Sequence, residues 1–210
     1  MDSLKYIQEK FELDAKQASP ITLLMSKYTG LPNLFTELGF RVGAEIGVNK
    51  GRFSKWICHQ MRRNKPKLFL IDPYKSYTEY SEYLDQNKMD AIYAEAQVRL
   101  AKYNCEFVKK MSMDAVKDFN DNSLDFVYID GNHDYQYVVN DIAEWSKKVR
   151  PGGIVSGHDY SKYMFQVVHA VDGWVASRHI KPLFLTSKHA CWFYVKNGEQ
   201  EPPRSGTKQW

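Results

Sequence analysis

One acidic residue and two glycines stand at a spacing that suits ligand binding, in the pattern Glu45-x-Gly47-x-x-x-Gly51. They follow a short apolar run that begins at Arg41 and reads as a strand, and they precede a pattern that predicts a helix. A strand, a glycine turn and a helix in this order form a cradle in an open α/β sheet, because small residues let an adenosyl group lie against the backbone. The spacing differs from the G-x-G-x-x-G fingerprint of dinucleotide sites.

A second buried strand, Lys67–Asp72, ends in a carboxylate about one strand–helix–strand unit after Gly47. An acid at the carboxyl end of the strand beside the glycine turn can accept hydrogen bonds from both hydroxyls of a ribose. We therefore expect Asp72 to bind the ribose of the ligand. The alternative is an aspartate that only caps the next turn.

A further dense stretch runs from Asp125 to Tyr160 and reads DFVYIDGNHDYQYVVNDIAEWSKKVRPGGIVSGHDY. A strand ending in I-D-G-x-H-x-Y, a helix, a P-G-G turn and a strand ending in H-D-Y resemble a methyltransferase family grouped with sugar and antibiotic-tailoring enzymes. The pattern around Gly47 is similar to the first motif of class I S-adenosylmethionine-dependent methyltransferases. With Asp72, these matches follow the family order over residues 40–160. The resemblance implies this fold and this cofactor.

The implied fold is α/β, with a Rossmann-like, doubly wound, mostly parallel seven-stranded sheet, an antiparallel last strand and an N-terminal helical segment. We expect a helical segment over 1–40, a methyltransferase domain over 41–196 and a polar tail over 197–210. The first segment should hold the helices Leu4–Gln17 and Ile21–Leu38, which could cover the cofactor, contact a second subunit or only pack. The expected strands are 41–48, 67–72, 105–109, 126–129 and 154–156, then a closing antiparallel pair in KPLFLTS and ACWFYVKN, and the expected later helices are 51–63, 135–149 and 161–179.

His133 lies three residues after Asp130, in the loop that follows the strand. In the enzymes that the chain resembles, a histidine at this spacing acts as a general base. An imidazole titrates near neutrality, which suits the removal of a hydroxyl proton. The other interpretation is that His133 caps the helix that begins near Tyr135.

Two carboxylates, Asp130 and Asp159, end strands that are neighbours in the resembled fold, about 4.8 Å apart. Together with His158 they offer three ligands to one divalent cation, and Asp130 is also expected to contact the cofactor. The resembled metal-dependent enzymes have an acid where His158 stands, so the imidazole favours manganese, iron or zinc over magnesium, or no metal at all. A nearby basic side chain could instead balance the two charges. Between the two aspartates, the lysine and arginine residues fall at the far end of the expected helix 135–149: Lys147, Lys148 and Arg150.

Residues 111–114 follow the expected third strand, where the adenine edge would lie in the resembled fold. Ser112 could supply a hydrogen bond there, and Met113 a hydrophobic wall. Both residue types are also common in loops without such a role.

Tyrosines recur every third residue at the start of the segment that follows Asp72, and further tyrosines come later in it; the positions are 74, 77, 80, 83, 93 and 103. On a helix the first four would form a slowly drifting stripe. Packing against the core is the favoured interpretation, and part of a substrate lid is the alternative.

The 210 residues carry 26% charged and 43% hydrophobic residues and a net charge of +4, which are ordinary values for a water-soluble domain. No apolar run approaches the ~20 residues that a membrane helix needs, and the N-terminus lacks a secretory pattern. Cys58, Cys105 and Cys191 are far apart in sequence and form no C-x-x-C pair, which suits a reducing compartment. We expect a cytoplasmic protein.

The expected function is S-adenosylmethionine-dependent O-methylation of a small hydroxylated molecule such as a sugar, glycoside or phenol. A nucleic-acid methyltransferase is less favoured, since the N-P-P-Y type motif of base methylation is absent after Asp130. The other alternative is a non-methylating relative, such as a hydroxylase-like or cofactor-binding protein. Expected partners are thus a small-molecule substrate and, as an option, further copies of the chain, with no membrane.

Overall fold

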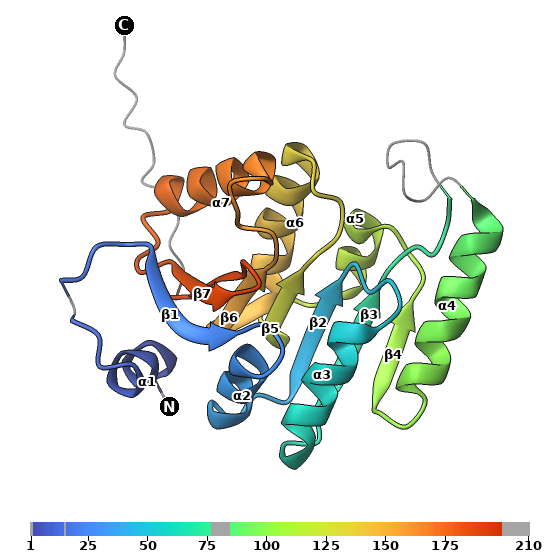
Figure 1. The fold of residues 1–210 in the computed structure, drawn as a ribbon, viewed down its shortest axis with the longest axis horizontal. Coiled ribbons are helices and arrows are strands. Elements are labelled where there is room, and N and C mark those ends of the chain that lie inside the picture. The colour runs from blue at the N-terminus through green and yellow to red at the C-terminus, as the bar shows by residue number, and fades with distance from the viewer. Residues whose placement is uncertain (1, 15, 77–84, 199–210) are drawn as a thin grey trace, which may run out of the picture.

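A single eight-stranded sheet runs through the molecule in the order β1-β7-β8-β6-β5-β2-β3-β4, as Figure 1 shows. The computed structural model describes residues 2–14, 16–76 and 85–198. The strands are β1 (Ile21–Ser26), β2 (Val42–Ile46), β3 (Lys67–Ile71), β4 (Cys105–Val108), β5 (Leu124–Ile129), β6 (Val149–Gly157), β7 (Phe184–Lys188) and β8 (Trp192–Val195). The helices are α1 (Ser3–Lys10), α2 (Gly30–Glu37), α3 (Arg52–Gln60), α4 (Gln86–Leu100), α5 (Ser112–Ala115), α6 (Tyr135–Lys148) and α7 (Phe165–Ser177), with short 3-10 turns η1 (Met61–Arg63) and η3 (Val116–Asp118).

All neighbouring strands are parallel except where β8 lies between β6 and β7, and β8 is antiparallel to both. This arrangement confirms the predicted Rossmann-like α/β fold and its antiparallel last strand. The order of the strands reverses between β2 and β5. In open α/β sheets, ligands bind outside the carboxyl ends of the strands at such a point.

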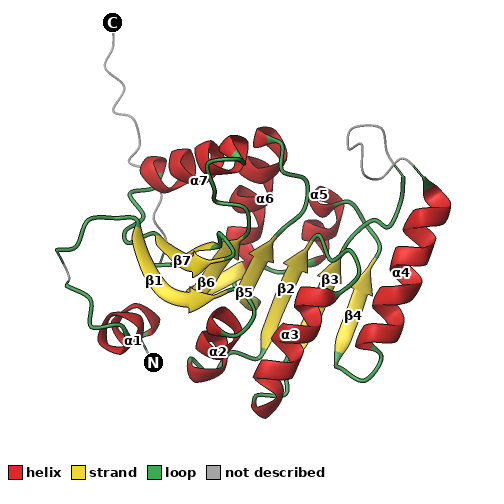
Figure 2. Ribbon diagram, viewed as in Figure 1, coloured by secondary structure: helices red, strands yellow, loops and turns green. Residues whose placement is uncertain are grey.

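Helices cover both faces of the sheet, with α2, α3 and α4 on one side and α5, α6 and α7 on the other (Figure 2). The first layer buries Phe35, Phe53 and Ile57, and the second buries Ile142 and Trp145. Burial of both faces explains why the strands read as nearly continuous apolar runs. Among the described helices, none is both long and apolar enough to cross a membrane.

The predicted helix Ile21–Leu38 is wrong in its first part, because residues Ile21–Ser26 form β1, an edge strand that pairs in parallel with β7. Side chains along β1 alternate between buried and exposed, which is the period of a strand. The second part is correct, since α2 covers Gly30–Glu37. The predicted seven-stranded sheet therefore gains an eighth strand, and the segment 1–40 is not purely helical.

Smaller differences concern where elements begin and end. Helix α1 stops at Lys10 and not at Gln17, and β6 begins at Val149, before the predicted turn at Pro151. Cys58 and Cys105, far apart in sequence, have sulfur atoms only 3.5 Å apart.

Tyr74 lies in a loop, not on a helix, and it is buried against Tyr93 of α4. The prediction that the tyrosines pack against the core is therefore confirmed for Tyr74 and Tyr93. Tyr77, Tyr80 and Tyr83, and with them the lid alternative, lie outside the described residues. Within the predicted polar tail, only residues 197 and 198 are described.

Candidate active site

The register of four adjacent strands brings the predicted site residues to one edge of the sheet. Ile46 of β2 is paired with Ile71 of β3 and Ile129 of β5, and Ile129 is paired with Gly157 of β6. The residue after each of these strand ends is one that the sequence singled out: Gly47, Asp72, Asp130 and His158. The site therefore follows from the level ends of parallel strands at the switch point.

Gly47 is required by a close approach between two loops. Its φ is +84°, and a Cβ atom there would lie 2.1 Å from the carbonyl oxygen of Asp130 and 2.7 Å from the Cα of Gly131. A side chain would collide with backbone that cannot move aside as a flexible side chain can. Gly51, with φ +67°, is followed directly by α3. The turn is thus locked to the loop after β5.

Asp72 ties the glycine turn to the end of β3. Its Oδ2 accepts the backbone N–H groups of Val48 (3.1 Å) and Asn49 (2.9 Å), and its Oδ1 accepts that of Tyr74 (2.9 Å). Burial raises the pKa of this carboxyl, while the three backbone donors oppose that shift. Asp72 therefore caps the turn, and since it also lines a cavity, its role as a ribose ligand stays a prediction.

Glu45 is buried within β2 and receives a hydrogen bond of 2.5 Å from the hydroxyl of Ser54 on α3. Burial raises the pKa of Glu45 to about 8, although the Ser54 hydrogen bond and the charge of Lys27 act in the opposite direction. The side chain of Glu45 therefore links α3 to β2 at the site.

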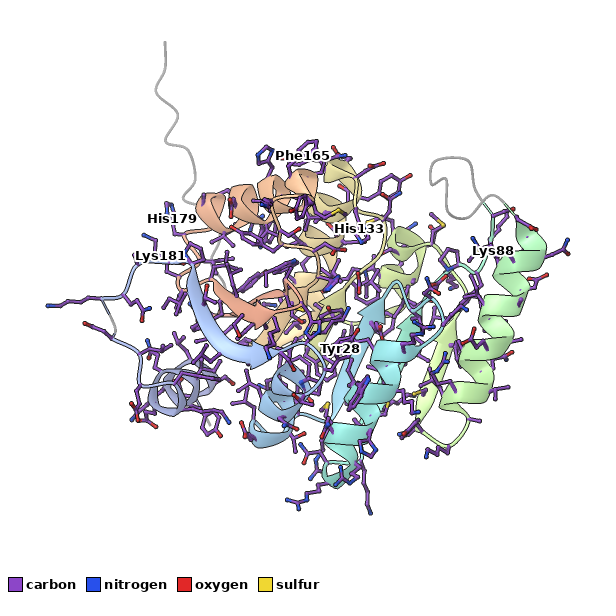
Figure 3. The ribbon with its side chains drawn as sticks, in the orientation of Figure 1. Tyr28, Lys88, His133, Phe165, His179 and Lys181 are labelled. Atoms are coloured by element: carbon purple, nitrogen blue, oxygen red, sulfur yellow. The ribbon has the colours of Figure 1, made fainter. Side chains whose placement is uncertain are left out.

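Four titratable side chains of the loops after β5 and β6 converge. The Nε2 of His133 lies 3.2 Å from Oδ2 of Asp159 and 3.6 Å from Oδ1 of Asp130. The Nδ1 of His158 lies 3.0 Å from Oδ1 of Asp159 and 3.6 Å from Oδ1 of Asp130. Asp159 has φ +59°, an uncommon conformation for aspartate that occurs at functional sites. Figure 3 shows His133 near the tip of β5.

Lys27 is the residue that the sequence did not reveal. It follows β1, and its Nζ lies 2.9 Å from Oδ2 of Asp130, with only 8% of its side chain exposed. The ammonium also lies over the rings of Phe53 (4.8 Å) and Tyr128 (5.1 Å). Burial alone would lower the pKa of Lys27, but Asp130 raises it above its ordinary value. Lys27 is thus a fixed cation beside the carboxylate of Asp130.

The charge of Asp130 is correspondingly stable. Burial acts to raise the pKa of its carboxyl, but the hydrogen bond with His133 and the charges of Lys27 and His158 bring the pKa down to about 2. The nearby Lys or Arg that the sequence left open as the balancing charge is therefore present.

Ser112 and Met113 differ in where they lie. Ser112 lines a cavity together with Met111, whereas Met113 packs against the hydrophobic cluster beneath α6 and α7. The Oγ of Ser112 accepts a hydrogen bond from Nε1 of Trp145 (2.8 Å) and donates one to the carboxylate of Asp141. Its one proton is therefore already used within the protein.

Two cavities lie at the switch point, and Gly47 and Gly131 line both. The larger, with a volume of about 430 Å³, is polar and is lined by Lys27, Glu45, Asp130 and His133 among others. The narrower lies toward β3 and α6 and is lined by residues that include Asp72, Ser112 and Asp141. A ligand that spans both must pass the two glycines.

Residues 44–160 match a protein family described as a methyltransferase domain. The chain belongs to this methyltransferase family. The match begins in β2 and ends just after Asp159, so it covers the ends of β2, β3, β5 and β6 at the site but not Lys27 after β1. The methyltransferase uses S-adenosylmethionine as its cofactor.

Individual relatives are distant. A segment of 79 residues is 37% identical to an uncharacterised protein of Acanthamoeba polyphaga mimivirus, and it spans 36% of that protein. An O-methyltransferase from Bacillus cereus, solved in complex with S-adenosylhomocysteine, is 16% identical and has a TM-score of 0.57 over 92% of this chain and 89% of its own. The O-methyltransferase NovP is also 16% identical, with a TM-score of 0.61 over 81% of this chain and 80% of its own. These structures share the fold of the methyltransferase.

The residues of the site fit such a cofactor. Among the described side chains that line the narrower cavity, the Nδ2 of Asn132 is buried without a hydrogen-bond acceptor. Gly47, where a Cβ would collide with the backbone of Asp130, lines both cavities. Asp72 lines the narrower cavity, and Glu45 and the turn beyond Gly47 line the larger one.

Proposed function

We propose that the methyltransferase methylates a hydroxyl group of a small molecule such as a sugar, glycoside or phenol, with His133 as the general base. The observation that carries the proposal is the position of His133 in the wall of the larger cavity, between the carboxylates of Asp130 and Asp159. Bound S-adenosylmethionine supplies a methyl group on a positively charged sulfur. Two proteins with the same fold, one from Bacillus cereus and the other NovP, are also O-methyltransferases.

The chemistry asks little more of the protein than alignment and proton removal. His133 would take the proton of the acceptor hydroxyl, which would free that oxygen to accept the methyl group that S-adenosylmethionine supplies when it is bound. The carboxylate of Asp159, at 3.2 Å, stabilises the imidazolium that results. Lys27 contributes a positive charge beside the oxygen on which negative charge develops.

A divalent cation is the second candidate for that electrostatic role. Ligand atoms of Asp130, His133 and Asp159 lie within 4.8 Å of one another, which is close enough for one ion. In this set His133 would bind the ion and could not also take the proton. The set Asp130, His158 and Asp159 would leave His133 available. Lys27 already balances Asp130, which weakens the electrostatic need for a cation.

The proposed reaction can be tested with methyl-labelled S-adenosylmethionine and a panel of sugars, glycosides and phenols, with an oligonucleotide and a peptide as other acceptor classes. We expect label to enter a hydroxylated small molecule, and NMR of the product should show the new methyl group on oxygen. Transfer to nitrogen, or to the nucleic acid alone, would contradict the proposal.

The cation can be tested separately by treatment with a chelator and addition of magnesium, manganese or zinc. If Lys27 supplies the charge, methyl transfer persists in the stripped enzyme, and Asp159→Asn reduces but does not abolish it. Activity that depends on added metal would assign the role to a cation.

A further inference from the structure

Two cysteine thiols are in contact in a part of the sheet that the proposed reaction does not use. Cys58 lies in the last turn of α3 and is 3% exposed, whereas Cys105, the first residue of β4, is half-buried. Their Sγ atoms are 3.5 Å apart. The sulfur atoms of a disulfide are about 2 Å apart, so a small approach of the two side chains is enough to join them.

The contact lies between a helix and the last strand of the sheet. Cys105 is paired with Leu68 at the amino end of β3, while the active-site residues follow the carboxyl ends of the strands. Figure 1 shows α3 over β3, next to β4 and α4. Cys58 belongs to the hydrophobic cluster under these elements, and Cys105 packs against it. A covalent bond here would therefore tie α3 to β4 at the edge of the sheet opposite the active site.

The two thiols differ in their readiness to react. The hydrogen bond from Cys58 lowers the pKa of Cys105, although burial acts in the opposite direction. The same contact and burial raise the pKa of Cys58. The thiolate is the form of cysteine that attacks oxidants, and its reaction also requires access from solvent. Cys105 is thus suited to react first, with Cys58 placed to react with the product.

We propose that Cys58 and Cys105 form a reversible intramolecular disulfide when the protein meets a hydroperoxide, and that this bond stabilises the attachment of α3 to β4. With hydrogen peroxide, the sulfur of Cys105 attacks one oxygen, the O–O bond breaks, and a sulfenic acid and one water form. The sulfur of Cys58 then attacks the sulfenic sulfur and loses its proton, and the oxygen leaves as a second water. Two electrons pass from the two thiols to one peroxide, and a dithiol reductant reverses the change.

The bond would act mainly on stability. It closes a loop that contains β3 and α4, and closure of a long loop removes conformations from the unfolded chain. The residues after the carboxyl ends of β2, β3, β5 and β6 keep their places. The inference is therefore independent of the proposed methyl transfer, and its test needs no measurement of activity. The alternative is that both cysteines only pack as small apolar side chains.

The bond can be tested on the reduced full-length protein. The protein is treated with dilute hydrogen peroxide under native conditions, alkylated, and digested without reduction for mass spectrometry. We expect a peptide pair joined through Cys58 and Cys105, with Cys191 alkylated, and dithiothreitol should return all three thiols. Three free thiols after peroxide, a sulfinic acid at Cys105 without a crosslink, or a crosslink between two chains would overturn the proposal.

Thermal unfolding tests the effect of the bond. The oxidised wild-type protein should unfold about 5–10 °C above the reduced protein, and peroxide should give no such increase in Cys105→Ala. Cys191→Ala is the matched control and should keep the full increase, because Cys191 is buried beside Tyr128. The same increase in Cys105→Ala, or a crosslinked wild-type protein with an unchanged midpoint, would contradict the stabilising role.

Discussion

At the scale of single residues, the site is organised around Asp130, which contacts Lys27, His133 and His158 at once. When one member of a buried ion pair is removed, the charge of the other member is left uncompensated. The resulting loss of stability is larger than the stability that the pair itself contributes. The charge of Lys27 thus helps to keep Asp130 ionised beside the imidazoles of His133 and His158. In the proposed reaction, the proton on His133 would lie beside the carboxylates of Asp130 and Asp159.

Lys27→Met should destabilise the protein by roughly 3 kcal/mol at pH 7, because ionised Asp130 then lacks its partner. The pKa of Asp130 in the folded protein is about 2, below the ordinary value of 3.8. Its stabilising contribution is thus present above about pH 4 and is lost as the pH falls toward 2. The loss in the variant should accordingly shrink at pH 3, as measured by urea unfolding.

Lys110→Met is the control, since Lys110 pairs with Asp118 at the surface. It should change the free energy of unfolding by less than about 1 kcal/mol at either pH. If the Lys27→Met protein lost the same free energy at pH 3 as at pH 7, the ion pair with Asp130 would not be the cause.

At the scale of elements, β1 delivers Lys27 to the site, and the glycine turn joins β2 to the loop after β5. Strand β1 lies at the edge of the sheet. Lys27, which follows it, nevertheless contacts the side chain of Asp130 in the loop after β5. The N-terminal segment therefore completes the site and does not merely lie beside it.

Two adjacent leucines of β1 test this strand. Leu23 is 2% exposed and Leu24 is 91% exposed, as expected for neighbours on opposite faces of a strand. Leu23→Ala should lower the free energy of unfolding by about 2–5 kcal/mol, and Leu24→Ala should change it by less than about 0.5 kcal/mol. Similar losses in both variants, measured by chemical denaturation, would argue against an alternating strand.

The glycine turn can be tested with a matched pair of substitutions. Gly47 and Gly39 both have positive φ, but a Cβ at Gly39 meets nothing within 4 Å. Gly39→Ala should cost about 1–2 kcal/mol for its conformation alone, while Gly47→Ala should cost roughly 2–5 kcal/mol, because it also collides with Asp130. Equal costs in thermal unfolding would show that the approach of the two loops is not what requires Gly47.

At the scale of the whole molecule, the site residues that the sequence predicts are those that stand directly after the end of a strand. Gly47, Asp72, Asp130 and His158 each follow an apolar run directly, and parallel strands bring such ends together. Lys27 was missed because ITLLMS was interpreted as part of a helix, although its buried residues alternate. Short apolar runs fit both periods, and only pairing with β7, far along the chain, decides between them.

Asp141 was missed for a different reason, although a signal was present. Along α6 the buried positions Val138, Asp141, Ile142 and Trp145 follow the spacing of an apolar stripe, and an acid occupies one of them. A charged residue at a core position indicates either a buried partner or a ligand. The sequence does not show that Ser112, from another helix, takes only one of its oxygens.

The central claim, that His133 is the base in methyl transfer, is tested most directly by turnover of His133→Ala alongside its affinity for S-adenosylhomocysteine. We expect turnover to fall by about two to four powers of ten, while the dissociation constant changes by no more than a few fold, since acid–base groups act on the reaction step. His169→Ala, at an exposed histidine on α7, should match the wild type in both measurements. Full turnover in a folded His133→Ala protein would contradict the account.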